Sequence, residues 1–324
     1  MGRLIALSLH RQGYQITLMD KDGKNAHQSA AYAAAGLLTP LGEAIHCEPN
    51  IVAMGFEALR LWPELLATLD EYSFFQQEGS IVVCHEQDQN EYSRYSRYLK
   101  NHYPQHRVQH LSRQQLEQLE PEIGRSFKQA LFLPDEGQIG NRKLLIALRY
   151  QLEKENVPWS SQCPVLAIEA ITGARQAGYS VHYQIGEKIR RTNYDLVIDC
   201  RGIGARKSLN RSAGGSNNGF SDLRAVRGEL LQLFAPNVHI TRPLRLMHPR
   251  YQLYIAPKGK GYYVVGASEI ESDDMSPMTL RSAMELMSAA YSIHSGFGEA
   301  NIRQQVCQLR PAFSDNQPKI THKP

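Results

Sequence analysis

The sequence predicts an α/β fold in which part of a doubly wound parallel sheet is interleaved with antiparallel strands. Residues 1–20 read as a short apolar helix that ends at Gly13, followed by a run of alternating residues and an acid. Residues 195–199 form an apolar run that closes on a glycine-rich turn, as strands of doubly wound sheets do. Residues 223–302 hold several short strand patterns separated by turn signals, which favours an antiparallel sheet.

The amino-terminal segment has features of a unit that binds a dinucleotide. Gly2 takes the place of the third glycine of a G-x-G-x-x-G loop, and Asp20 follows 18 positions later. In such units an acid about 20 positions on binds the adenosine ribose. The first strand and the first two glycines do not appear in the sequence, so we expect a fragment in which Met1 is an internal methionine of the phosphate loop. The alternative is an ordinary surface helix followed by a strand.

Composition restricts the class of protein. With 324 residues, 21% of them charged and 42% hydrophobic, the chain is long enough for two domains and typical of a folded globular protein. The net charge of +4 is modest and the basic residues are scattered, so we expect no nucleic-acid partner. No run of 18 apolar residues occurs, so we expect no membrane association, and the absence of a secretory signal together with five scattered cysteines favours a cytoplasmic location.

One histidine pattern could suggest a metal. His102, His106 and His110 recur every four residues, which is a helical spacing. Pro104 interrupts the stretch, and no acid or cysteine lies within it. We therefore expect no metal site.

Helices and strands alternate in the first half of the chain. Apolar residues at helical spacing predict a helix over 51–70, broken or kinked at Pro63. Asn141 is expected to cap a helix whose leucines share one face. The other elements expected there are a strand over 79–84, polar helices over 87–101 and 112–119, and a turn over 132–137.

Strands dominate the second half. The run 194–200 is expected to be a buried strand that ends on the glycine-rich turn 201–204. The segment 213–219 is expected to be a flexible loop near a domain crossing. The other expected elements are strands over 165–170, 179–184, 226–234, 252–256, 262–266 and 301–308, and a helix over 279–291.

Four segments, in this order, carry a family resemblance. Residues 29–40 contain five alanines and one glycine, and small residues suit close approach of the backbone to a flat ring system. Residues 133–138 precede the helix that begins near Asn141. The third segment is a substrate-sheet pattern in three parts: residues 226–229 match R-G-[QE], residues 254–258 match Y-[LIV]-x-P-[RK], and residues 265–269 match G-A-[TS]-x-E, with Glu269 one place early. The fourth segment, residues 308–318, matches L-R-P-x-x-x-D-x-x-P.

Over nearly its whole length the chain thus resembles the FAD-dependent amine oxidases of the D-amino acid oxidase superfamily, most closely the bacterial glycine oxidases of thiamine biosynthesis. The resemblance implies a Rossmann-like, doubly wound FAD-binding domain over 1–77, 136–222 and 303–324, and an interleaved α+β substrate domain over 78–135 and 223–302. The family continues with a strand, a second substrate arginine and a helix, so we expect both the first strand and the last helix of the FAD domain to be missing.

The resemblance assigns catalytic and substrate-binding roles to Tyr254 and Arg310, which would hold the carboxylate of the substrate, and places Leu37 and Glu269 at the pocket. Taken alone, Tyr254 could be a strand tyrosine packed in a sheet, and Arg310 could be a surface ion-pair partner. We expect Arg227 to be a structural pair across the domain interface rather than a site residue. The residues implied to bind FAD are Gly2, Asp20, Ala34, Ala35, Gly36, Leu37, Val165 and Gly202.

The implied function is oxidative deamination of a small amino acid, with glycine as the lead candidate and oxygen as the acceptor. It would give the imine or glyoxylate, ammonia and hydrogen peroxide, and serve thiamine thiazole synthesis. The alternatives are a quinone-linked D-amino acid or sarcosine dehydrogenase of the same superfamily and an inactive truncated remnant. Assembly into a homo-oligomer is a further expectation.

Overall fold

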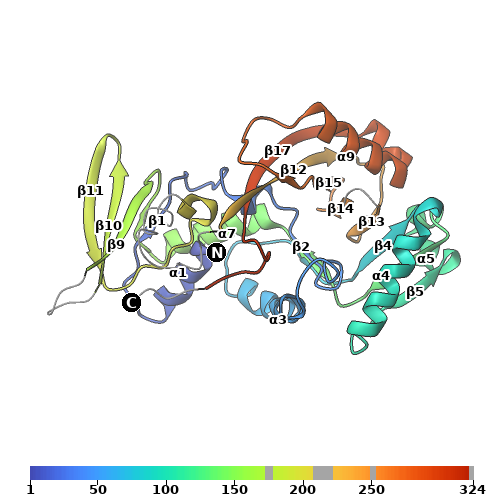
Figure 1. Ribbon diagram of the computed structural model, residues 1–324, viewed down its shortest axis with the longest axis horizontal. Coiled ribbons are helices and arrows are strands. Elements are labelled where there is room, and N and C mark those ends of the chain that lie inside the picture. The colour runs from blue at the N-terminus through green and yellow to red at the C-terminus, as the bar shows by residue number, and fades with distance from the viewer. Residues whose placement is uncertain (172–177, 207–221, 249–252, 321–324) are drawn as a thin grey trace.

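The computed structural model describes residues 1–171, 178–206, 222–248 and 253–320. A nine-stranded, mainly antiparallel sheet forms the right-hand part of the molecule in Figure 1. Its strands are β4 (Ser80–Cys84), β5 (Gln109–Ser112), β6 (Gln129–Leu133), β12 (Arg224–Phe234), β13 (Leu244–Met247), β14 (Leu253–Pro257), β15 (Tyr262–Gly266), β16 (Ile270–Glu271) and β17 (Asn301–Ala312). The order is β16-β12-β15-β14-β13-β4-β6-β5, with β17 paired to β12, and only the β13–β4 pair of this sheet is parallel among the described strands.

Three smaller sheets lie around the large one. β1 (Leu18–Met19) pairs in parallel with β8 (Trp159–Ser160). β7 (Gly137–Ile139) lies between β2 (Leu37–Leu38) and β3 (Phe75–Gln76). β9 (Val165–Ile171), β10 (Gly178–Ile185) and β11 (Lys188–Tyr194) form an antiparallel sheet that extends from one end of the molecule in Figure 1.

Helices pack beside the β1–β8 pair. α1 (Gly2–Arg11) and α7 (Asn141–Lys154) share a buried cluster that includes Leu7, Leu148 and Leu152. α3 (Pro49–Leu66) contributes Trp62 and Leu66 to the edge of this cluster and contains Pro63. The predicted helix over 51–70 is therefore confirmed, although it ends four residues early.

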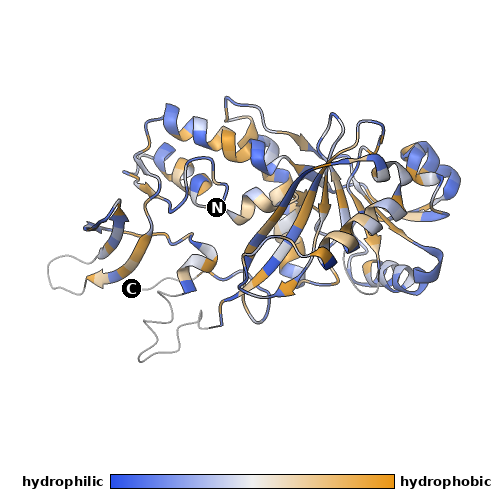
Figure 2. Ribbon diagram, turned by 90° about the horizontal axis from the view of Figure 1, so that it is seen from above, coloured by the Kyte–Doolittle hydropathy of each residue, from blue (hydrophilic) through white to orange (hydrophobic). Residues whose placement is uncertain are grey.

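Different elements pack on the two faces of the large sheet. Leu231, Leu253 and Val265 pack in one core with α9 (Leu280–Ile293), which Thr279 caps by accepting the Ser282 N–H at 3.2 Å. Figure 2 shows apolar residues running through the central strands. On the opposite face, near β4, lie residues 41–52 and α4 (Gln89–His102). The remaining helices are α2 (Ala30–Ala33), α5 (Arg113–Leu119), α6 (Pro121–Gly124) and the 3-10 turns η1 (Glu86–Asp88), η2 (Gly202–Ala205) and η3 (Ser295–Glu299).

Most predicted elements of the large sheet are confirmed, but two predictions are wrong. Residues 195–200 form no strand, and Leu196 and Ile198 are 61% and 48% exposed, because no described strand pairs with this run and no described residue buries these two side chains. Asn141 is not the cap of α7: Gly140 takes that place, and the Asn141 amide donates instead to the carbonyl oxygen of Ala31. The predicted loop 213–219 lies outside the described residues.

Of the expected doubly wound sheet, the described residues show the parallel β1–β8 pair. Among the helices of the described part of the chain, none is long and apolar enough to cross a bilayer.

Candidate active site

The candidate site lies on the sheet face opposite α9. Leu230, Gly266, Tyr254 and Arg245 are successive cross-strand partners on β12, β15, β14 and β13. Directly opposed residues share a face, and their sequence neighbours point to the other one. Because the neighbours Leu231, Leu253 and Val265 pack in the core with α9, the side chains of Tyr254 and Arg245 emerge together on the opposite face.

A segment of small residues covers this face. Ala33, Ala35 and the partly buried Leu37 pack in one cluster with Leu230 and Tyr254. Gly36 has φ +71°, and a Cβ atom on it would overlap the Ile139 carbonyl oxygen, so only glycine lets β2 lie this close to β7. The small-residue segment and Tyr254, which are far apart in the sequence, therefore meet on this face.

Lys258 ties the same sheet face to β7. It follows β14, four residues after Tyr254, and its Nζ donates to Gln138 Oε1 at 3.0 Å and to the Ile139 carbonyl at 3.2 Å. Burial lowers the pKa of this ammonium group to about 7. The Lys258 contacts fix β14 relative to the strand that pairs with Leu37 and Leu38.

Tyr254 fits against its neighbours because residue 266 is glycine. A Cβ atom on Gly266 would lie 2.8 Å from the Tyr254 hydroxyl oxygen and 3.0 Å from Cζ. Burial raises the pKa of the Tyr254 phenol to about 12, although the positive charge of Arg310 acts in the opposite direction. The phenol is therefore protonated at neutral pH and can donate a hydrogen bond to a carboxylate.

Arg310 lies near the end of β17, four residues after Val306, so it shares the face on which Val306 packs with the small-residue segment. Its Nε would lie 3.6 Å from a Cβ atom on Gly228, so the guanidinium passes over a position without a side chain. Its Nη2 is 3.5 Å from Glu269 Oε1, and the Arg310 side chain is 50% exposed. The structure thus brings Glu269 to Arg310 rather than into the cavity beside Tyr254.

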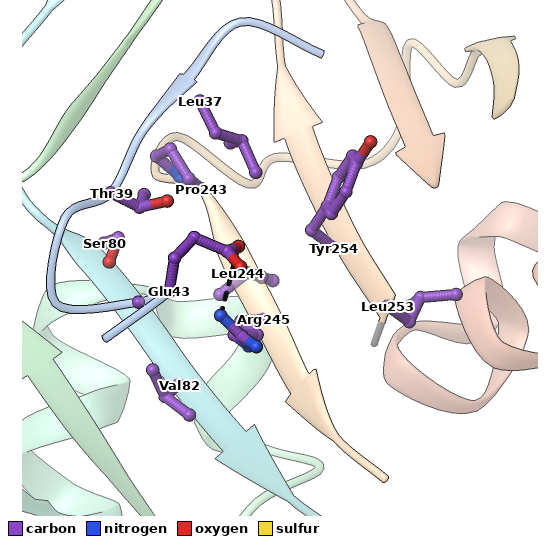
Figure 3. A pocket seen from close by; sticks show the side chains of 11 residues that line it. Leu37, Thr39, Glu43, Ser80, Val82, Pro243, Leu244, Arg245, Leu253 and Tyr254 are labelled. Atoms are coloured by element: carbon purple, nitrogen blue, oxygen red, sulfur yellow. Dashed lines mark hydrogen bonds and ion pairs between the residues drawn. The ribbon is translucent and has the colours of Figure 1, made fainter. Parts of the chain in front are cut away.

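A small cavity of ≈ 20 Å³ adjoins Tyr254 (Figure 3). Leu37 lines it, as expected from the sequence, and so do Thr39, Glu43 and Arg245. Arg245 Nη1 is 3.2 Å from Glu43 Oε1. Sequence reasoning missed Arg245; the available signal was the alternation of residues 244–247, in which one arginine interrupts apolar neighbours in a strand.

Glu136, a second residue that sequence reasoning missed, holds the loop beside the cavity. Its side chain is fully buried, Oε1 accepts the Gly42 N–H at 2.8 Å, and Oε2 bonds the Ser80 hydroxyl. Gly42 and Ser80 both line the cavity. Burial raises the pKa of Glu136 to about 7, against the opposing effect of these hydrogen bonds.

The residues proposed to bind the nucleotide form a connected path. The Asp20 carbonyl accepts the N–H of Cys163, two residues before Val165 at the start of β9. A Cβ atom on Gly2 would lie 3.4 Å from Cys200 Cβ, and one on Gly202, where φ is +57°, would lie 3.5 Å from the Pro311 ring. Pro311 follows Arg310, so the contacts of Gly2, Cys200 and Gly202 lead to Arg310.

This path fits the chemistry of FAD. The half-buried carboxylate of Asp20 can accept hydrogen bonds from ribose hydroxyls. The first turn of α1 has no side-chain cap, so its N–H groups suit phosphate oxygens. Ala34, Ala35 and Gly36 present no bulky side chain to a flat ring.

Arg142 fixes the small-residue segment to the sheet. Its Nε donates to the Tyr32 carbonyl at 3.0 Å, and its Nη1 donates to Gln232 at 2.9 Å and Gln304 at 2.8 Å. The guanidinium carbon also lies 4.0 Å from the centre of the Tyr32 ring. One side chain thus joins α7, α2, β12 and β17.

Arg227 forms a structural pair, as expected, but the expectation that this pair crosses the domain interface is wrong. Its side chain is buried, pairs with buried Glu229 at 2.6 Å, and donates to the carbonyls of Asp274 and Pro277. All these partners lie in the 223–302 section, so the pair stabilises that section rather than bridging to another. No group of three or more metal-ligating side chains occurs among the residues described.

Comparison with known proteins places the chain in a family. The chain matches the family described as "DAO: FAD dependent oxidoreductase" over residues 1–324. It is 31% identical over 322 residues to "Putative thiamine biosynthesis oxidoreductase ThiO" of Rhizobium etli, covering 99% of this chain and 84% of the relative. It is 23% identical to "Bifunctional protein ThiO/ThiG" of Synechocystis, covering 99% of this chain and 44% of that protein.

Solved structures share the fold. Glycine oxidase from Geobacillus kaustophilus matches with a TM-score of 0.81 at 20% identity, covering 100% of this chain and 83% of that one. Glycine oxidase from Bacillus cereus matches with a TM-score of 0.78 at 19% identity, covering 98% and 81%. The chain therefore belongs to the DAO family of FAD dependent oxidoreductases, and FAD is its cofactor.

Proposed function

We propose that this protein catalyses FAD-dependent oxidation of a small amino acid, with glycine as the first candidate. The products are the imine or glyoxylate, ammonia and hydrogen peroxide, with oxygen as the acceptor. The observation that carries the proposal is that the side chains of Tyr254 and Arg310 lie on one sheet face, the face on which the small-residue segment with Leu37 packs. The similarity to ThiO proteins supports a role in thiamine thiazole synthesis.

Tyr254 and Arg310 hold the substrate carboxylate in this proposal. The guanidinium supplies a planar pair of N–H donors and the neutral phenol supplies an O–H donor. In this structure Glu269 Oε1 lies 3.5 Å from Arg310 Nη2, and the Glu269 side chain is largely exposed. A substrate carboxylate therefore replaces an exposed ion pair, which contributes at most about 1 kcal/mol.

The cofactor residues proposed are Gly2, Asp20, Ala34, Ala35, Gly36, Leu37, Val165 and Gly202. When bound, FAD supplies the acceptor for the hydride that leaves the substrate Cα. Leu37 and Tyr254 exclude water from the region beside the cavity, because both pack in one apolar cluster.

The domain assignment belongs to the same proposal. We assign 1–77, 136–222 and 303–324 to a doubly wound FAD-binding domain, and 78–135 and 223–302 to the substrate domain. A cytoplasmic location and a homo-oligomeric state also stay predictions.

The test uses the purified chain supplied with FAD, and measures retained flavin absorbance and peroxide formation with glycine, sarcosine and D-alanine. We expect Arg310→Met and Tyr254→Phe to retain flavin and to lower kcat/KM for every amino acid at least tenfold. Arg60→Met, which breaks the surface pair with Glu57, is the matched control and leaves both values unchanged. Retained flavin without peroxide from any of the three amino acids would contradict the proposal.

A further inference from the structure

Arg245 has the geometry of a second anion-binding residue. It is the cross-strand partner of Tyr254, lines the same cavity, and has a side chain that is 11% exposed. The carboxylate beside it belongs to Glu43, whose side chain is 49% exposed and reaches in from the loop after β2 (Figure 3). The pair thus consists of a cation that is fixed on a strand and largely shielded from solvent, and an acid that reaches solvent.

We propose that Arg245 is a specificity-determining residue that binds a second acidic group of the substrate in place of Glu43. Small amino acids that carry a second carboxylate then bind with one carboxylate on Arg310 and Tyr254 and the other on Arg245, whereas glycine uses only the first of these two positions. This inference rests on the proposed function, because it takes the site of the first carboxylate from there.

Two features support the replacement of Glu43 by a substrate carboxylate. The Glu43 carboxylate shows that this position accepts a carboxylate, and guanidinium groups bind such groups in a planar, bidentate manner. Glu43 can return to water at little cost because half of its side chain is already exposed. The cavity holds ≈ 20 Å³ with Glu43 in place, so a second acidic group enters only when Glu43 leaves.

The surroundings of Arg245 explain why it can exchange Glu43 for a substrate carboxylate without a rearrangement of the fold. Its positive charge acts on the fully buried Glu136, which is hydrogen-bonded to Gly42 and Ser80. These bonds hold the loop that carries Glu43, so its side chain can rotate while the backbone stays in place.

The test compares succinate with butyrate, two anions of equal chain length that differ by one carboxylate, by calorimetric binding to the FAD-supplied protein. We expect succinate to bind about tenfold more tightly than butyrate, because its second carboxylate accepts one additional charge-assisted hydrogen bond, and such a bond contributes about this factor in affinity. Arg245→Met brings this ratio close to one. Glu43→Gln removes the competing acid and raises succinate affinity several-fold, while butyrate affinity stays constant. Arg60→Met is the control and keeps the wild-type ratio.

Three results would each overturn the inference. They are equal affinities of the wild type for succinate and butyrate, an unchanged ratio of these two affinities in Arg245→Met, and weaker succinate binding by Glu43→Gln. Failure of the proposed function is seen separately. In that case glycine produces no peroxide and Arg310→Met binds both anions as the wild type does. Loss of both anions in Arg310→Met, with a wild-type ratio near one, would leave the oxidase proposal standing and overturn only the role of Arg245.

Discussion

Glu136 makes the stability of this protein depend on pH in a predictable direction. It is a fully buried carboxyl group that holds Gly42 and Ser80 beside the cavity, and its pKa is raised from 4.5 to about 7. The folded state thus binds the proton of Glu136 more tightly than the unfolded state does. The associated stability is fully present below pH 4.5 and is lost as the pH rises through about 7.

The magnitude follows from the shift. A rise of about 2.5 pKa units at roughly 1.36 kcal/mol per unit corresponds to about 3 kcal/mol. Glu136→Gln removes this titration but keeps a carbonyl oxygen for the Gly42 N–H and gives the Ser80 hydroxyl an amide donor. We therefore expect the free energy of unfolding of Glu136→Gln to exceed that of the wild type by up to about 3 kcal/mol at pH 8.

The assay is urea unfolding of both proteins at half-unit steps from pH 5 to pH 8.5. The difference between the two proteins isolates Glu136, because the other titrating groups are common to both. The difference should grow in favour of Glu136→Gln from pH 5 to about pH 7 and level off at higher pH. A difference that stays constant over the whole range, or that favours the wild type increasingly at high pH, would refute this reasoning.

Three further substitutions test the packing of the site. Gly266→Ala places a methyl group 2.8 Å from the Tyr254 hydroxyl, so we expect a loss of about 1–3 kcal/mol in urea unfolding and a raised KM. Gly36→Ala meets the Ile139 carbonyl at φ +71°, so little soluble, flavin-retaining protein should be recovered after expression. Arg142→Met removes three hydrogen bonds that fix the small-residue segment, and should cost about 2–3 kcal/mol and weaken FAD retention measured by ultrafiltration. Wild-type stability in any of the three would contradict the packing described.

Patterns along the chain predicted the elements whose burial is decided locally. Helices such as α4 and α9 show an apolar face, and strands such as β12 and β15 are long enough to stand out. β13 has only four residues, and its partner β4 lies far away in the sequence, so the single arginine among its apolar residues is too weak a signal to mark it as a strand. The run 194–200 has the composition of a buried strand, but composition does not reveal whether another strand or helix covers it.

The candidate site was predictable where the family patterns name a residue, as for Tyr254, Arg310 and Leu37. Arg245 was not, because its place beside Tyr254 depends on the register between β13 and β14. Glu136 lies within a segment that sequence reasoning did single out, yet its burial against Gly42 and Ser80 appears only in three dimensions. Contacts between distant segments are thus what the sequence alone leaves undetermined.

The most direct test of the central claim is anaerobic addition of glycine to the FAD-supplied protein while the visible flavin spectrum is recorded. The account predicts that glycine bleaches the flavin absorbance of the wild type and that Arg310→Met, with the same flavin content, bleaches at least tenfold more slowly. A protein that retains FAD but shows no bleaching with glycine, sarcosine or D-alanine would contradict the assignment of this site to amino-acid oxidation.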